Sequence, residues 1–235
     1  MIPDVHLKPW IFEKAEEIVS AGQYDRIVIL GDLADDWGKQ LYTEAYRETY
    51  DAVISFIRRH PESLFCYGNH DISYFWEAVE SGYSRVARDT AVEGYNRMVK
   101  ELGSDKCAFV HMIDKVIFSQ AGITESFVER CFGLSGSISE YDLVYVIKQI
   151  NRMGQEELWR DDSPIWARPE GRRRFCLSEG FRQVVGHTPV KEPVEYGNLL
   201  VVDTFSTYSD GRPIGDESFV CIDTNDGKWQ KETGR

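Results

Sequence analysis

The first half of the chain alternates short apolar runs with longer stretches in which apolar residues recur at helical intervals. Residues 26–30 and 63–67 are compact apolar runs, which is typical of buried strands. Residues 11–20 and 42–59 place their apolar side chains on one stripe, so two helices are predicted there. This alternation of strand and helix indicates βαβ units with parallel strands.

The hydrophobic period shortens from Cys107 onward. Strands are predicted over 107–113, 116–119, 183–185, 199–202 and 219–222, and helices over 86–102, 138–150 and 156–159. Asp114-Lys115 separates the first two strands by a tight turn, so these strands are expected to form a hairpin. The pattern as a whole predicts an α/β protein. At ~150 residues per domain, the 235 residues are expected to form a single domain, 1–235.

Composition and charge narrow the function classes. The chain has 27 Lys and Arg against 39 Asp and Glu, a net charge of −12, whereas a nucleic-acid scaffold would be basic. No apolar run reaches the ~18 residues of a membrane span, and residues 1–10 lack the apolar core of a signal peptide. Five cysteines without C-x-x-C spacing are typical of reduced thiols, so we expect a cytoplasmic protein without a membrane or nucleic-acid role. The basic run Arg172-Arg173-Arg174 is interpreted as a solvated loop, with substrate binding as the alternative.

Four polar clusters each follow the end of a predicted strand or begin the chain. They are Asp4-Val5-His6, the acidic stretch Gly31–Asp36, Gly68-Asn69-His70-Asp71 and Gly186-His187-Thr188. Ligands of open α/β sheets bind beyond the carboxyl ends of strands, and carboxylates and imidazoles bind divalent metals. Each cluster also has a plain alternative: a surface loop, an acidic helix cap at Asp35 or Asp36, or an Asn turn.

The order of these motifs, D-x-H, G-D-x-x-D, G-N-H-D and G-H-T over residues 4–188, resembles the calcineurin-like metallophosphoesterases. The stretches W-A-R-P at 166–169 and V-V-D-T at 201–204 resemble the phosphoprotein phosphatase branch of that family. The branch includes serine/threonine phosphatases and symmetric bis(nucleoside) tetraphosphatases. The resemblance implies two packed mixed β-sheets flanked by helices, a four-layer sandwich.

The resemblance also implies a site with two divalent ions, manganese first and iron, zinc, nickel or cobalt as alternatives. The residues that match its ligands are Asp4, His6 and Asp32 for the first ion, and Asp32, Asn69 and His187 for the second. A hydroxide bridging the ions would attack phosphorus. His70 matches the general acid, Asp35 the carboxylate that orients it, and Arg168 a phosphate-binding arginine.

Two positions depart from the family pattern. Gln120 stands where a histidine ligand of the second ion is expected, and an amide oxygen is a weaker ligand, so that site is expected to be weak. Asp36 replaces a phosphate-binding arginine, which disfavours ordinary phosphoprotein recognition. The expected function is metal-dependent hydrolysis of a phosphomonoester or a nucleotide phosphoanhydride. The expected substrate is a phosphorylated small molecule, a nucleotide or a phosphoprotein. The alternative is a degenerate member that binds phosphate or a partner without efficient turnover.

Overall fold

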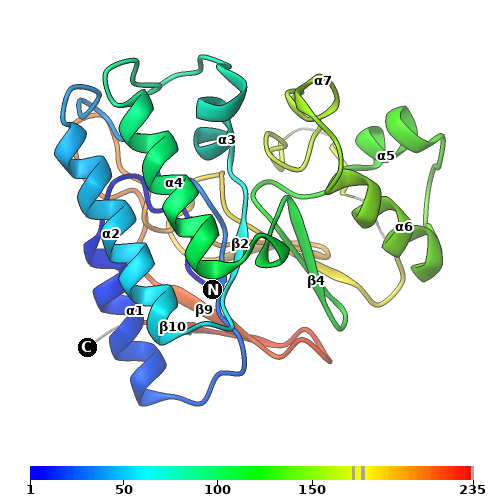
Figure 1. Ribbon diagram of the computed structural model, residues 1–235. Helices are drawn as coiled ribbons and strands as arrows, with labels where there is room; N and C mark the ends of the chain where they lie inside the picture. Colours follow the sequence, from blue (N-terminus) through cyan, green and yellow to red (C-terminus); the bar gives the residue numbers. More distant parts are fainter. Residues whose placement is uncertain (171–172, 176–177, 234–235) are drawn as a thin grey trace.

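The computed structural model describes residues 1–170, 173–175 and 178–233 (Figure 1). Arg172 of the basic run and Cys176 therefore lie outside the described residues. The helices are α1 (Trp10–Ala21), α2 (Thr43–Arg59), α3 (Asn69–Trp76), α4 (Arg88–Leu102), α5 (Glu125–Phe132), α6 (Glu140–Ile150), α7 (Gln155–Leu158) and a 3₁₀ helix (Ser104–Lys106). The strands are β1 (Val28–Ile29), β2 (Leu64–Cys66), β3 (Cys107–Ala108), β4 (Val110–Ile113), β5 (Val116–Ser119), β6 (Arg182–Val185), β7 (Val194–Tyr196), β8 (Leu199–Val201), β9 (Phe219–Ile222) and β10 (Trp229–Glu232).

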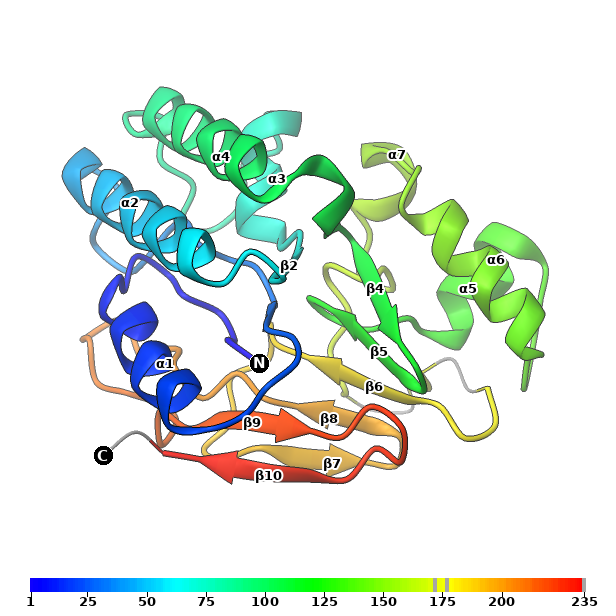
Figure 2. The ribbon, with the colours of Figure 1, turned by 60° about the horizontal axis from the view of Figure 1, so that its bottom comes forward.

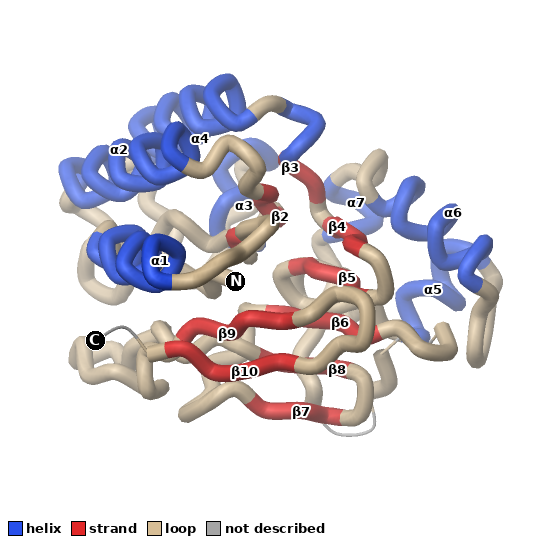
Figure 3. The backbone as a smooth tube through the Cα atoms, turned by 90° about the horizontal axis from the view of Figure 1, so that it is seen from below, coloured by secondary structure: helices blue, strands red, loops and turns tan. Residues whose placement is uncertain are grey.

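The strands form two main sheets and a separate hairpin. The first sheet has the order β1-β2-β3 with parallel neighbours. The second is mixed, with the order β4-β5-β6-β8-β7, in which β5, β6 and β8 run parallel. β9 and β10 pair antiparallel as a two-stranded hairpin beside them (Figure 3). The mixed α/β class is therefore confirmed.

The fold has four layers: helices, the first sheet, the second sheet and helices. Ile29 and Phe65 of the first sheet pack with α1, α2 and α4, while their neighbours Val28 and Cys66 face the second sheet. On the other side, α5, α6 and α7 cover the outer face of β4 and β5 (Figure 2). Alternation along each strand thus sends one set of side chains to the helices and the other set to the space between the sheets.

The predicted strand over 107–113 is two strands in different sheets. β3 extends the first sheet beside β2, and after Phe109 the chain enters β4 at the edge of the second sheet. The predicted hairpin is confirmed, because Ile113 pairs with Val116 across the Asp114-Lys115 turn. Hydrophobic periodicity gives no information on which sheet a strand joins, so the crossing could not be predicted.

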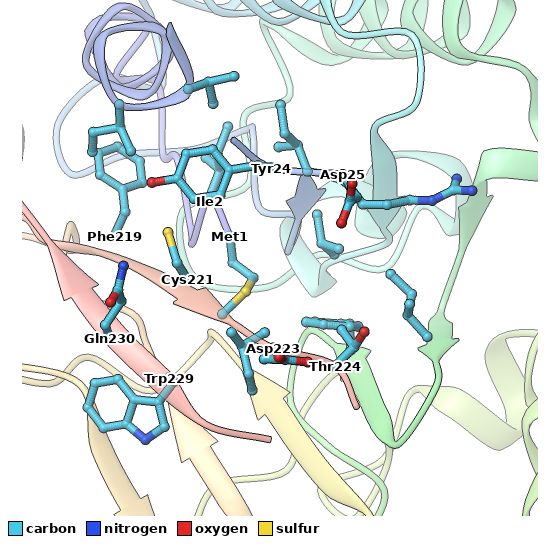
Figure 4. Close-up of a pocket in the computed structure, with 18 of the residues that line it drawn as sticks. Met1, Ile2, Tyr24, Asp25, Phe219, Cys221, Asp223, Thr224, Trp229 and Gln230 are labelled. Atoms are coloured by element: carbon cyan, nitrogen blue, oxygen red, sulfur yellow. The ribbon is translucent and has the colours of Figure 1, made fainter. Parts of the chain in front are cut away.

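A cavity of about 700 Å³ lies between the β1 side of the first sheet and the β9–β10 hairpin. Tyr24, Phe219 and Trp229 are among its lining residues, and the chain begins at its wall (Figure 4). The amino group of Met1 donates to the carbonyl of Val220 at 2.6 Å. None of the candidate site residues lines this cavity.

Candidate metal centre

The four sequence motifs meet where the two sheets adjoin. Asp32 and Asn69 follow β1 and β2 of the first sheet, while Gln120 and His187 follow β5 and β6 of the second. Asp4 joins them because Ile2 bridges to Ile29 of β1 in parallel. Carboxyl ends of parallel strands share one edge, so residues far apart in sequence converge there.

Backbone strain is concentrated at this convergence. Eight described residues other than glycine have positive φ, and four of them are candidate site residues: His6, Asp32, Asp35 and His187. Non-glycine residues in this region cost of order 1–3 kcal/mol each and cluster at functional sites. The packing around the motifs therefore holds these side chains in conformations that the isolated backbone disfavours.

Asp4 and Asp32 form a buried carboxylate pair, each 1% exposed. Gln120 donates from Nε2 to Asp4 Oδ2 at 2.9 Å and to Asp32 Oδ2 at 2.7 Å. The backbone N–H of His187 also donates to Asp4 at 3.0 Å. Burial raises the pKa of both carboxyl groups, and that of Asp32 lies well above its usual value. Such a pair is stabilised by positive charge between its members.

Several ligand-type atoms around this pair are buried and have no hydrogen-bond partner among the described residues. They are Oδ1 of Asn69, Nε2 of His187 and Oε1 of Gln120. The amide nitrogen of Asn69, which is a donor and not a metal ligand, is also unpartnered. Buried polar groups in proteins are nearly always paired, so such a cluster needs an explanation, and a bound ion is one. Burial lowers the pKa of His6 and His187 well below the usual value, which keeps both rings neutral as metal binding requires.

The orientation of the His6 ring is also suited to metal binding. Its Nδ1 is held by the carbonyl oxygens of Asp35, at 2.9 Å, and Ala34, at 3.3 Å, and its Nε2 lies 3.8 Å from Asp4 Oδ2. A backbone contact at one ring nitrogen commonly fixes the other toward a metal. His6, Asp32 and His70 each offer a ligand atom within 4.8 Å of the others. The donor set, carboxylate oxygens, an amide oxygen and neutral imidazoles, therefore fits divalent cations.

His70 and Asp35 form a dyad beside the carboxylate pair. His70 Nδ1 lies 3.1 Å from Asp35 Oδ2, and the ring is 5.0 Å from that of His6, edge to face. Tyr46 and Tyr74 donate to the other oxygen of Asp35, at 2.7 and 2.5 Å. Burial alone would lower the pKa of His70, but the negative charges of Asp32 and its carboxylate partners raise it well above the usual value. The dyad thus places an imidazole paired with a carboxylate next to the convergence.

Arg168 lies on the second-sheet side of the same cluster. Its Nη1 donates to the carbonyl of His187 at 2.8 Å and contacts Thr188 Oγ1 at 3.5 Å. All nine site residues expected from the sequence are therefore within this one region of the fold. Gln120 differs in one respect, because its amide nitrogen, and not the oxygen expected of a ligand, faces the carboxylates.

Three acidic residues of the region were given no role by the sequence motifs. Asp71, in the G-N-H-D motif, accepts hydrogen bonds from the backbone N–H groups of Asp32 (2.7 Å), Leu33 (2.9 Å) and Gly68 (3.0 Å). It thereby ties the loop after β1 to the loop after β2. Asp203, in V-V-D-T, is fully buried, and burial together with the nearby charge of Asp4 raises its pKa. Glu80 has no motif around it and contacts His70.

Comparisons with known proteins identify the family of the chain. The family model for calcineurin-like phosphoesterases matches residues 1–200, so the chain belongs to that family. Among solved structures, it is similar to a protein serine/threonine phosphatase from Saccharomyces cerevisiae with similarity to human phosphatase PP5. The identity is 15% and the TM-score 0.49, over 85% of this chain and 64% of the yeast one. No curated protein matches the chain.

Proposed function

We propose that the protein is a phosphoesterase that hydrolyses a phosphomonoester or a nucleotide phosphoanhydride with the help of two divalent ions. Family membership already implies a hydrolase of phosphorylated compounds that depends on divalent metal ions. The observation that carries the finer proposal is the buried pair Asp4–Asp32, surrounded by unpartnered ligand atoms and adjoining the His70–Asp35 dyad. Manganese is the proposed ion, since the oxygen-rich donor set suits it.

Two groups of side chains would hold the ions. Asp4, His6 and Asp32 are proposed for the first, and Asp32, Asn69 and His187 for the second. When bound, such ions supply an activated water and neutralise charge on phosphate oxygens. Gln120 enters this proposal as a hydrogen-bond donor to Asp4 and Asp32, because its amide nitrogen faces them. The second ion then lacks the further ligand that a histidine at position 120 would supply, which is consistent with a weak site.

The remaining residues bind and protonate. His70 is proposed as the general acid that protonates the leaving oxygen, since nearby carboxylates raise the pKa of its ring and the ring lies beside that of His6. Asp35, fixed by two tyrosine hydroxyls, would hold that ring in place. Arg168 would contact phosphate oxygens and stabilise the charge that they carry.

The substrate, the location and the number of domains remain proposals. Asp36 is paired with Lys39 at 2.8 Å, so it presents a neutralised pair where the family has an arginine. This favours a small phosphorylated molecule or nucleotide over a phosphoprotein. None of the helices in the described part of the chain is long and apolar enough to cross a membrane. A cytoplasmic location and a single domain over 1–235 stay predictions.

A degenerate, non-hydrolytic member is the second candidate. The observation in its favour is Gln120, whose amide already satisfies one oxygen of each carboxylate and so reduces the need for a cation there. Such a protein would bind phosphate or a partner at the same site without turnover.

Metal titration followed by a phosphatase assay separates the two candidates. The purified protein is depleted of metal, then supplied in turn with manganese, nickel, cobalt and zinc, and assayed above pH 7 on an aryl phosphate. Turnover with at least one ion, most with manganese, supports the enzyme. Binding of ions and phosphate without turnover supports the degenerate member. A panel of phosphopeptides and diadenosine tetraphosphate then identifies the substrate class.

A further inference from the structure

Glu80 lies in the loop between α3 and α4 and reaches the nitrogen of His70 that Asp35 also contacts. Its Oε1 is 2.9 Å from His70 Nδ1, compared with 3.1 Å for Asp35 Oδ2. The side chain of Glu80 is only 6% exposed. Both carboxylate oxygens lie within hydrogen-bond distance of this single ring nitrogen, and Glu80 Oε1 has no other hydrogen-bond partner among the described residues. Two carboxylates therefore compete for one N–H group.

The loop that carries Glu80 is fixed by the residues that hold Asp35. The backbone N–H of Ser84 donates to Tyr74 Oη at 3.0 Å, and Tyr74 donates to Asp35 Oδ1 at 2.5 Å. Gly82 has φ of +105°, and a Cβ there would lie 3.4 Å from Asp35 Cβ and 3.5 Å from His70 Cε1. The loop thus packs directly on the dyad, so the position of Glu80 is determined by the fold.

We propose that Glu80 is a second positioning residue for His70, an inference that rests on the proposed function. An imidazole that donates from Nδ1 to a carboxylate keeps Nε2 directed at the reacting group and its proton available. With two carboxylates at Nδ1, either one can accept the N–H when the other is lost. Glu80 therefore sets the orientation of His70 together with Asp35, and each substitutes in part for the other.

This mutual substitution is a measurable property. Glu80→Gln is expected to lower kcat on an alkyl phosphate roughly 10-fold with KM unchanged, a fraction of the 10²–10⁴-fold that a general acid supplies. In the Asp35→Asn background, Glu80→Gln should lower kcat by a larger factor than it does in the wild type, because no carboxylate then remains at His70 Nδ1. The double variant should then match His70→Asn. On an aryl phosphate, whose leaving group needs little protonation, every one of these losses should shrink.

The matched control is Glu77→Gln in the same loop, an exposed carboxylate that pairs with Arg88, and it should leave kcat unchanged. A second readout does not depend on turnover. In metal-free ¹⁵N-labelled protein, the His70 Nδ1–H proton should exchange with water faster in Glu80→Gln than in the wild type. In the double variant, exchange should be fast enough that the NMR signal of this proton disappears.

Three outcomes would overturn the inference. The first is that the kcat losses of Glu80→Gln and Asp35→Asn simply multiply in the double variant. The second is that these losses are equal on the alkyl and the aryl phosphate. The third is a fall in bound metal in Glu80→Gln, which would make Asp35, His70 and Glu80 a metal site. If the wild-type protein shows no turnover with any ion, the proposed function fails. The exchange measurement then decides the role of Glu80 alone.

Discussion

Replacing Gln120 by Met would test how the buried carboxylates are held. The side chain is fully buried, and its Nε2 donates to both Asp4 and Asp32. Methionine fills a similar volume but cannot donate a hydrogen bond. The variant therefore removes two hydrogen bonds to charged groups while keeping the packing.

The cost in the metal-free protein can be worked from these contacts. A hydrogen bond to a charged group contributes about 1.5–3 kcal/mol, so losing two costs about 3–6 kcal/mol. Burial raises the pKa of Asp4 and Asp32, so protonation recovers part of that loss, and we expect a value nearer 3 kcal/mol. For a chain of this size, Tm should fall by about 6–12 °C.

The assay is thermal unfolding with a chelator and again with saturating manganese. Bound ions would neutralise both carboxylates, so the difference in Tm between Gln120→Met and the wild type should shrink when manganese is present. Gln183→Met is the matched control. Gln183 is also buried, and its side chain bonds the backbone of Ile123, so its cost should not depend on metal. If manganese instead widens the deficit of Gln120→Met, Gln120 is a ligand through its oxygen and the reasoning is wrong.

Two further substitutions and a change of pH test metal binding and proton donation at the same site. Gln120→His should raise the affinity for a second ion and the turnover together, by isothermal titration and steady-state assay; unchanged stoichiometry would exclude a ligand position at 120. His70→Asn should lower kcat by roughly 10²–10⁴-fold at constant metal content, and loss of metal would show that His70 is a ligand. Chelation should lower Tm more at pH 8 than at pH 5. Burial raises the pKa of Asp4 and Asp32, so protons compete with the ions for these carboxylates more strongly as pH falls. In the metal-free protein, the two buried carboxylates destabilise the fold increasingly as pH rises. An equal effect at both pH values would contradict this.

The part of the site that lies on strand ends could be predicted from the sequence. Asp32, Asn69 and His187 each follow a short apolar run, and the carboxyl ends of parallel strands meet at one edge of a sheet, so a shared site is predicted for them. The third motif was less clear, because an Asn-His-Asp sequence is also typical of a turn. It begins α3, where the carboxylate of Asp71 accepts the backbone N–H of Gly68 and replaces an ordinary cap.

Other features depend on tertiary structure alone. Glu80 contacts His70 only because Ser84 and Tyr74 anchor an irregular loop, and no periodicity or motif marks that loop. The donor role of the Gln120 amide depends on which of its two ends faces the carboxylates, which residue type does not determine. The lengths of short strands are also hard to predict from the sequence. β1 covers only Val28–Ile29, whereas a strand of five residues is expected at 26–30.

Two glycines explain how the carboxylates of Asp32 and Asp4 come close to the backbone of other segments. A Cβ at Gly68 would lie 2.0 Å from Asp32 Oδ1, and a Cβ at Gly186 would lie 2.0 Å from Asp4 Oδ1. Gly186 directly follows β6 of the second sheet, and Gly68 lies two residues after β2 of the first sheet. At both positions a side chain would block the carboxylate that lies there. The G-N-H-D and G-H-T motifs therefore combine two requirements at adjacent positions. The glycine makes room for the carboxylate of another motif, and the residue behind it supplies a ligand-type atom to the same space.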